Sequence, residues 1–169
     1  YIVGVKKGDW VKYDVDITNP VGYNTATAKM EVLDVNATSL TIRVTKQMSD
    51  GEESSQSFTG DVTVGVDVWV IPANLTVGNS FNLPDLGIIT IDGESTKTYA
   101  GASRKVVRAY ALLSNTTYNK CGYEIYWDKQ TGVAVEIFSF GIGVYYREYL
   151  TYKATETNMW QAEFDPTLL

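Results

Sequence analysis

The sequence contains no histidine, and this absence removes several kinds of enzyme site. The common serine and cysteine nucleophiles depend on an imidazole base, and zinc sites frequently use imidazole ligands. Imidazole is also the side chain whose ordinary pKa suits proton transfer near neutral pH. The chain is therefore not expected to hold a Ser-His-Asp, Cys-His or histidine-zinc centre.

Cysteine is almost absent as well, since Cys121 is the only one. A single cysteine cannot form an intramolecular disulfide, so cysteine usage does not identify the compartment. Without a base beside it, Cys121 is interpreted as a half-buried structural thiol rather than a nucleophile. No spacing typical of a metal or phosphate site is present, and no metal or cofactor is predicted.

Long apolar runs and an excess of positive charge are also missing. No stretch approaches the roughly 20 apolar residues that cross a bilayer, so no transmembrane segment is predicted. The net charge is −6 and the sequence pI is about 4.6. These values argue against nucleic-acid binding and disfavour an anionic membrane surface.

The chain is instead rich in residues that favour strands, including 12 tyrosines and 4 tryptophans. Apolar and polar residues alternate over 10–17, which predicts a strand with one buried and one wet face. The segment 62–70 places valine at every second position, which predicts that Val62, Val64, Val66, Val68 and Val70 share one buried face of a core strand.

The most distinct hairpin is expected over 123–138. Its turn spans 128–132, where Gly132 suits a left-handed backbone, Lys129 lies at an exposed tip and Trp127 packs beside the turn. Further strands are expected at about 27–35, 40–44, 53–59, 87–92, 96–101, 104–113 and 144–154.

No helical periodicity or linker divides the chain, so residues 1–169 are interpreted as a single all-β domain with little helix. About ten successive strands predict one strongly curved antiparallel meander, either a half-barrel or barrel-like. The chain starts at Tyr1 without an initiator methionine, which indicates excision from a longer precursor with a signal peptide or an anchor.

Three glycosylation sequons begin at Asn36, Asn74 and Asn115, each in a predicted turn or loop. Glycans at these positions require exposed side chains and an exterior location. The sequence therefore predicts a secreted or cell-surface protein.

Aromatic side chains are concentrated in the last third of the chain. Because neighbours in a strand point to opposite faces, these rings cannot all fill one core, and some must meet solvent or a partner. They suit stacking on sugars or lining an apolar pocket, and cross-strand pairing within the sheet explains them equally. The candidate ligand-binding residues are Tyr126, Trp127, Tyr146 and Tyr149.

Two segments carry a resemblance to a known group. The opening 3–13 contains Gly-Asp-Trp-x-x-Tyr and the segment 126–136 contains Tyr-Trp-Asp-Lys-x-Thr-Gly, while 71–79 and 157–160 fit the same pattern. Together they resemble uncharacterised extracytoplasmic proteins of archaea, and the similarity spans nearly the whole chain. The resemblance implies location and style of fold, and no activity.

A weaker fold-level similarity is to the lipoprotein-carrier class, whose curved half-barrels hold acyl chains and often contain an Asp-x-x-Thr-Gly hairpin.

Three functions follow from these observations. The first is a non-enzymatic extracytoplasmic domain that binds an apolar ligand such as a lipid, or that serves as a building block contacting other cell-surface proteins. The second is a carbohydrate-binding module. The third is an acid-dependent glycosidase, with carboxylate pairs such as Asp14 with Asp16, or Glu124 with Asp128. A flat row of exposed rings favours the second, and an apolar concavity favours the first.

Overall fold

The computed structural model describes residues 2–84, 86–115, 119–145, 147–163 and 167, with only the backbone described at 114 and 115. These residues form strands joined by turns, and no α-helix is found among them, which confirms the predicted all-β fold. The elements are β1 (Trp10–Asn19), β2 (Gly22–Asn36), β3 (Ser39–Met48), β4 (Glu53–Asp61), η1 (Val62–Val64), β5 (Ser80–Leu83), β6 (Gly87–Thr90), β7 (Gly93–Tyr99), β8 (Ala102–Asn115), β9 (Lys120–Asp128), β10 (Ala134–Ile142) and β11 (Arg147–Thr157).

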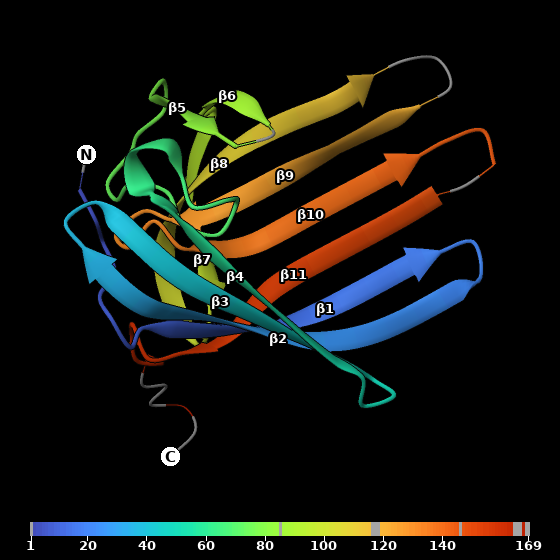
Figure 1. Cartoon of the computed structure of the whole chain (residues 1–169), viewed down its shortest axis with the longest axis horizontal. Coiled ribbons are helices and arrows are strands. Elements are labelled where there is room, and N and C mark those ends of the chain that lie inside the picture. Colours follow the sequence, from blue (N-terminus) through green and yellow to red (C-terminus); the bar gives the residue numbers. More distant parts are fainter. Residues whose placement is uncertain (1, 85, 116–118, 146, 164–166, 168–169) are drawn as a thin grey trace.

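Nine of these strands make one antiparallel sheet in the order β4-β3-β2-β1-β11-β10-β9-β8-β7. Each half is a meander of successive hairpins, and the halves join where β1 pairs with β11, near opposite ends of the chain. Figure 1 shows the sheet bending strongly, with β3 and β4 crossing in front of the other strands. Edge strands β4 and β7 are not paired with each other in the described structure, so the sheet remains an open, curved half-barrel.

Alternation along β1 defines the two faces of this sheet. Val11, Tyr13 and Val15 are buried, whereas Lys12 and Asp14 are exposed, as the sequence predicts. We call the face that carries Tyr13 the inner face and the opposite one the outer face. Cross-strand pairing carries the same two faces onto β2 and β11.

The inner face is covered by residues 62–92, which leave the large sheet after β4 and include the small β5–β6 sheet. The ring of Trp69 packs against that of Tyr13 with centroids 5.6 Å apart, and Phe81 packs edge-on against Trp127 at 5.7 Å. Trp127 also donates from Nε1 to the carbonyl oxygen of Val68 at 2.8 Å. The covering segment therefore completes the hydrophobic core.

The predicted core strand over 62–70 is wrong. Residues 62–64 form a 3-10 turn capped by Asp61, whose carboxylate accepts a hydrogen bond from the amide of Thr63 at 2.8 Å. Gly65 follows with a φ of 78°, and the chain then doubles back. Val64 is consequently 42% exposed, while the other four valines are buried in the covering segment. The capping and the glycine turn override the alternating pattern because they redirect the backbone within three residues.

The hairpin of β9 and β10 is confirmed. The Gly132 amide donates to the Asp128 carbonyl oxygen at 2.7 Å, and Gly132 has a φ of 77°. Trp127 is fully buried beside the turn. Lys129 is not at an exposed tip, because its ammonium pairs with Glu94 at 2.8 Å and its side chain is largely covered.

The segments that carry the family resemblance contact one another in the fold. The Asn158 side chain accepts a hydrogen bond from the Trp10 amide at 2.8 Å and donates one to the Gly8 carbonyl oxygen at 3.0 Å. The segment 157–160 is therefore hydrogen-bonded to the segment 3–13. In the same way, the amide of Ile71 donates to the carbonyl oxygen of Gly132 at 2.9 Å. These motifs therefore hold the two ends of the chain and the covering segment onto the sheet.

Candidate functional site

The four predicted ligand-binding residues do not form one site. Trp127 belongs to the core on the inner face, fully buried under Phe81. Tyr126 and Tyr149 both project from the outer face, where they are half-buried. Tyr146 lies outside the described residues.

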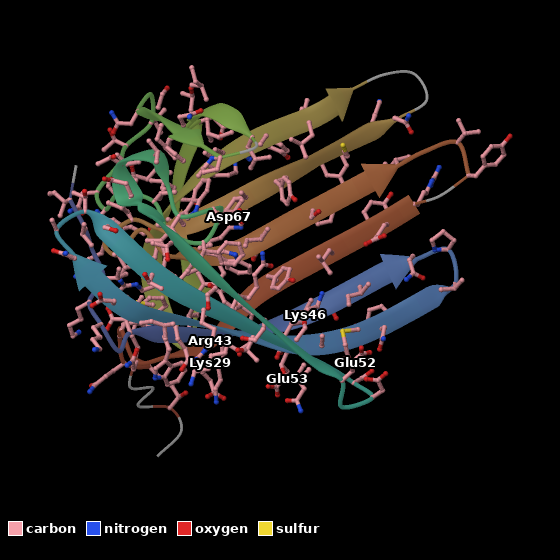
Figure 2. The ribbon with its side chains drawn as sticks, viewed as in Figure 1. Lys29, Arg43, Lys46, Glu52, Glu53 and Asp67 are labelled. Carbon is pink, nitrogen blue, oxygen red and sulfur yellow. The ribbon has the colours of Figure 1, made fainter. Side chains whose placement is uncertain are left out.

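The inner face offers little room for a ligand, because the covering segment fills it. A pocket of about 230 Å³ remains between β3, β4 and the sheet, lined by Phe58, Trp69, Tyr152 and Lys46 among others. Figure 2 labels Lys46 on β3, and its ammonium lies 5.9 Å from the ring centroid of Tyr152. Ligand pockets usually measure about 300 to 1,000 Å³, so this one is small for an acyl chain.

The outer face carries a row of rings across neighbouring strands. Phe140 on β10 lies opposite Tyr149 on β11. Thr18 on the next strand, β1, lies opposite Tyr149 on one side and opposite Tyr23 of β2 on the other. Phe138 lies nearly parallel to both Phe140 and Tyr149, with interplanar angles of 26° and 17° and centroids about 6 Å apart. We call Tyr23, Phe138, Phe140 and Tyr149 the outer aromatic row.

A carboxylate lies beside the outer aromatic row. Glu124 faces Phe138 across the β9–β10 pair and Tyr110 across the β8–β9 pair. It accepts hydrogen bonds from the hydroxyls of Tyr110 and Tyr126, each at 3.0 Å. The hydrogen bond to Glu124 raises the pKa of Tyr110. Glu124 is thereby held in place among rings.

On its other side the outer aromatic row borders a polar hollow of about 560 Å³. Thr25 on β2 lies opposite Asp16 on β1, and Asp16 also accepts a hydrogen bond from the hydroxyl of Tyr23. This bond raises the pKa of Tyr23. The side chains in the hollow that can hydrogen-bond a ligand include Asp14, Asp16, Thr25, Thr27 and Gln47. We refer to the outer aromatic row and this polar hollow together as the outer-face site.

A charged cluster lies farther along the outer face, on β2 and β3. Arg43 pairs with Glu31 at 3.0 Å, and Lys29 pairs with the same carboxylate at 3.4 Å. The hydrogen bond from Arg43 lowers the pKa of Glu31. Figure 2 labels Lys29 and Arg43 close together. Such exposed pairs contribute little to stability, and the positive and negative groups here satisfy each other.

The carboxylate pair suggested for a glycosidase does not form at the hairpin. Asp128 is fully buried and is engaged by Arg104 at 2.8 Å and by the hydroxyl of Thr131 at 2.8 Å, whereas Glu124 projects from the outer face. Asp14 and Asp16 lie side by side on one strand instead of facing each other across a cleft. Among the described residues, no group of three acidic or cysteine side chains is placed to hold a metal ion.

Sequence reasoning missed Phe138, Phe140 and Tyr23. The available signal was β10, where Ile137 is apolar on the inner face and both phenylalanines are apolar on the outer face, although most outer positions are polar. In a sheet with one buried and one solvent-facing side, a strand that is apolar on both sides indicates that its solvent-facing side also makes apolar contacts. The row itself depends on strand register, which the sequence did not provide.

Two of the three sequons have the exposure that glycosylation requires. Asn36 ends β2 before a turn and is exposed. Asn74 is exposed in the covering segment with a φ of 61°. The side chain of Asn115, at the end of β8, lies outside the described part. Attachment of glycans stays a prediction.

No protein-family model matches this chain, and no curated protein does. Among solved structures, one described as the crystal structure of MucB matches with a TM-score of 0.45 and 13% sequence identity, over 97% of this chain and 57% of that one. The MucA/MucB complex of Pseudomonas aeruginosa matches with a TM-score of 0.44 and 14% identity, over 97% of this chain and 56% of the other. The chain thus spans little more than half the length of these structures. In the described part no helix is long and apolar enough to cross a membrane.

Proposed function

We propose that this chain is a non-enzymatic binding domain of the cell exterior that holds a carbohydrate chain on its outer-face site. The observation that carries the proposal is the outer aromatic row, in which Tyr23 is exposed and the other three rings are half-buried, directly beside a hollow lined with hydrogen-bonding side chains. The exposed sequons at Asn36 and Asn74 support the exterior location.

The two halves of the site suit the two kinds of surface on a sugar. The apolar C–H face of a pyranose packs on an aromatic ring, and its hydroxyls need acceptors and donors at the edge. Phe138 stacks with both Phe140 and Tyr149, so these three rings form one partly exposed apolar surface. The exposed ring of Tyr23 lies beside it. Asp16 and Thr25 supply acceptor and donor groups next to them.

The charge of the site restricts the class of carbohydrate. Asp14, Asp16 and Glu124 all project from the outer face around the outer aromatic row. Lys153 lies opposite Asp14, and Arg108 lies 3.7 Å from Glu124, whereas Asp16 has no ion pair among the described residues. Carboxylates repel uronic acids and sulfated sugars, and they attract protonated amino groups. The expected ligands are therefore neutral or amino sugars.

The apolar-ligand hypothesis has less support, because its natural place was the concave inner face. The covering segment packs into the core on that face, and the pocket at Trp69 and Tyr152 is small. A lipid would have to displace the covering segment, which is hydrogen-bonded to the β9–β10 turn through Ile71.

A glycan array of neutral, amino and acidic oligosaccharides tests the proposal directly. We expect binding to neutral or amino glycans, followed by titration calorimetry with the best one. Tyr149→Ala and Phe140→Ala should each weaken binding about tenfold, since a stacking position contributes roughly 0.5–1.5 kcal/mol and its burial adds to this. Asp16→Asn, which preserves shape, should weaken it several-fold.

The matched control is Tyr145→Ala, because Tyr145 is an exposed tyrosine in the connection after β10 and outside the outer-face site. It should leave the affinity unchanged. Thermal unfolding of every variant separates lost binding from lost folding. The proposal is refuted if no glycan binds, or if Tyr149→Ala and Tyr145→Ala behave alike.

A further inference from the structure

One end of the large sheet exposes large apolar side chains on three neighbouring hairpins. Val21, in the turn between β1 and β2, is 95% exposed, and Tyr145, in the connection between β10 and β11, is 94% exposed. Val144 lies beside Tyr145, and Leu112 and Leu113 lie near the end of β8; all three are at least half exposed. We call these five residues, together with the strand ends that carry them, the hairpin end.

The strand order places these three hairpins side by side. Strands β2, β1, β11, β10, β9 and β8 are consecutive neighbours in the sheet. The last residue pairs before the three turns all lie at the same end of the strands. They are Asn19 with Gly22, Ile142 with Arg147, and Asn115 with Lys120. Figure 1 shows β1 with β2, β10 with β11 and β8 with β9 ending on the same side of the molecule.

The opposite end of the sheet is different. The turn from β2 to β3 contains only alanine and threonine, and the turn from β9 to β10 places Val133 in the core. Among the described residues of those two turns, no large apolar side chain is exposed. The apolar exposure at the hairpin end therefore does not follow from turn formation itself, which favours polar residues and glycine.

The local charge of the hairpin end also differs from that of the whole chain. Residues 19–23, 112–121 and 142–148 contain Lys120, Arg147 and Glu148 as their only charged residues, a net charge of +1 in a chain of net charge −6. Lys120 and Arg147 are exposed, each at the end of a hairpin. The acidic turn between β3 and β4 is set back, because β3 ends opposite Ala26. Figure 2 labels Glu52 and Glu53 at that turn.

We propose that the hairpin end inserts its apolar side chains into the surface of a lipid bilayer that contains anionic headgroups. Shallow insertion needs separate apolar points and flanking cations, and tyrosine suits the boundary between headgroups and acyl chains. A protein interface instead needs a contiguous complementary area of about 800 Å² on each partner. Side chains that are more than nine-tenths exposed on separate turns fit the first requirement. None of the five apolar residues that define the hairpin end belongs to the proposed carbohydrate site, although Tyr23 of that site follows Val21 by two residues.

Flotation of the full chain with vesicles tests the contact. The probes are vesicles of phosphatidylcholine alone and of equal parts phosphatidylcholine and phosphatidylglycerol. We expect binding to the mixed vesicles, weaker binding to the neutral ones, and a decrease with added salt because the attraction to headgroups is screened. Absence of binding to the mixed vesicles would overturn the proposal.

Substitutions locate the contact. Val21→Ser combined with Tyr145→Ser should lower partitioning onto the mixed vesicles at least about tenfold, because two apolar side chains no longer leave water. Ile88→Ser is the matched control, since Ile88 on β6 is 79% exposed and lies in the covering segment. It should leave partitioning unchanged. Equal effects of the two changes would contradict the assignment of the hairpin end.

Two further measurements distinguish other occupants. If the hairpin end instead joins two copies of this chain, sedimentation will show a dimer that the double variant abolishes, and the bilayer proposal fails. A glycan on Asn115 in protein from its own host would also contradict it, since this sequon ends one of the three hairpins. Tyr149→Ala should leave vesicle binding intact. Failure of the bilayer proposal can therefore be distinguished from failure of the carbohydrate proposal.

Discussion

Replacing Gly132 with alanine is expected to lower the free energy of unfolding by about 3 kcal/mol or more. Gly132 has a φ of 77°, a left-handed conformation that costs an alanine about 1–2 kcal/mol. An added Cβ would also lie 2.0 Å from the carbonyl oxygen of Ile71, which belongs to the backbone and cannot rotate away. The covering segment would have to shift, and overpacking of this kind costs a further 1–3 kcal/mol or so.

Gly87→Ala is the matched control for backbone strain. Gly87 has a φ of 78°, but an added Cβ would meet no atom within 4 Å beyond its chain neighbours, so only the conformational cost of about 1–2 kcal/mol is expected. Urea denaturation of both variants gives the comparison. Similar midpoints would show that contact between the β9–β10 turn and residue 71 contributes nothing beyond the turn's own geometry.

Replacing Asp128 with alanine should be at least as damaging, at about 3–5 kcal/mol. Asp128 is fully buried, and its carboxylate accepts from Arg104 at 2.8 and 3.0 Å. It also accepts from the amide and the hydroxyl of Thr131 at 3.0 and 2.8 Å. Without it, the amide and hydroxyl of Thr131 lose their buried acceptor, and the Arg104 guanidinium, whose side chain is only 15% exposed, keeps Gln130 and the Trp160 ring but loses its carboxylate.

The control for Asp128 is an exposed pair of the same type. Asp92 pairs with Arg108 at 3.0 Å, with both side chains about a third exposed or more, so Asp92→Ala should cost no more than about 1 kcal/mol. Thermal and urea unfolding of the two variants measure the difference. Equal losses would mean that burial does not strengthen the dependence on the Asp128 carboxylate.

Both expected effects concern residues of the segment 126–136, on which the sequence-based resemblance was suggested. In the fold, Asp128 and Gly132 organise the β9–β10 turn and hold residue 71 against it. Asn158 similarly joins the closing motif to Gly8. The residues of these motifs thus serve the assembly of the fold, and the outer-face site lies on other residues.

The strands could be predicted where the signal is local. Alternation in β1 and the glycine at the β9–β10 turn depend on neighbours within a few residues, and both predictions are confirmed. The segment 62–70 failed although its alternation was the most regular. There, Asp61 capping and the left-handed Gly65 changed the chain direction, and burial came from packing over the sheet instead of from a strand face.

The candidate site could be predicted only in part. Tyr149 was selected because the many aromatic rings in the last third of the chain cannot all be buried. The same reasoning also selected Trp127, which is fully buried in the core. Nothing local distinguishes these two residues. Whether a ring meets solvent depends on which face the covering segment occupies, and that segment precedes the rings by dozens of residues.

The sequence by itself determined the all-β class, the approximate strands and the acidic charge, because each follows from residue types and short-range periodicity. Only the tertiary structure decided that β1 pairs with β11, that residues 62–92 cover the inner face, and that the outer aromatic row forms. The first of these depends on pairing between strands more than a hundred residues apart, and the other two depend on strand register and on packing of the covering segment. Such register is set by the packing of whole faces, where a shift of one residue would exchange the buried and exposed sides.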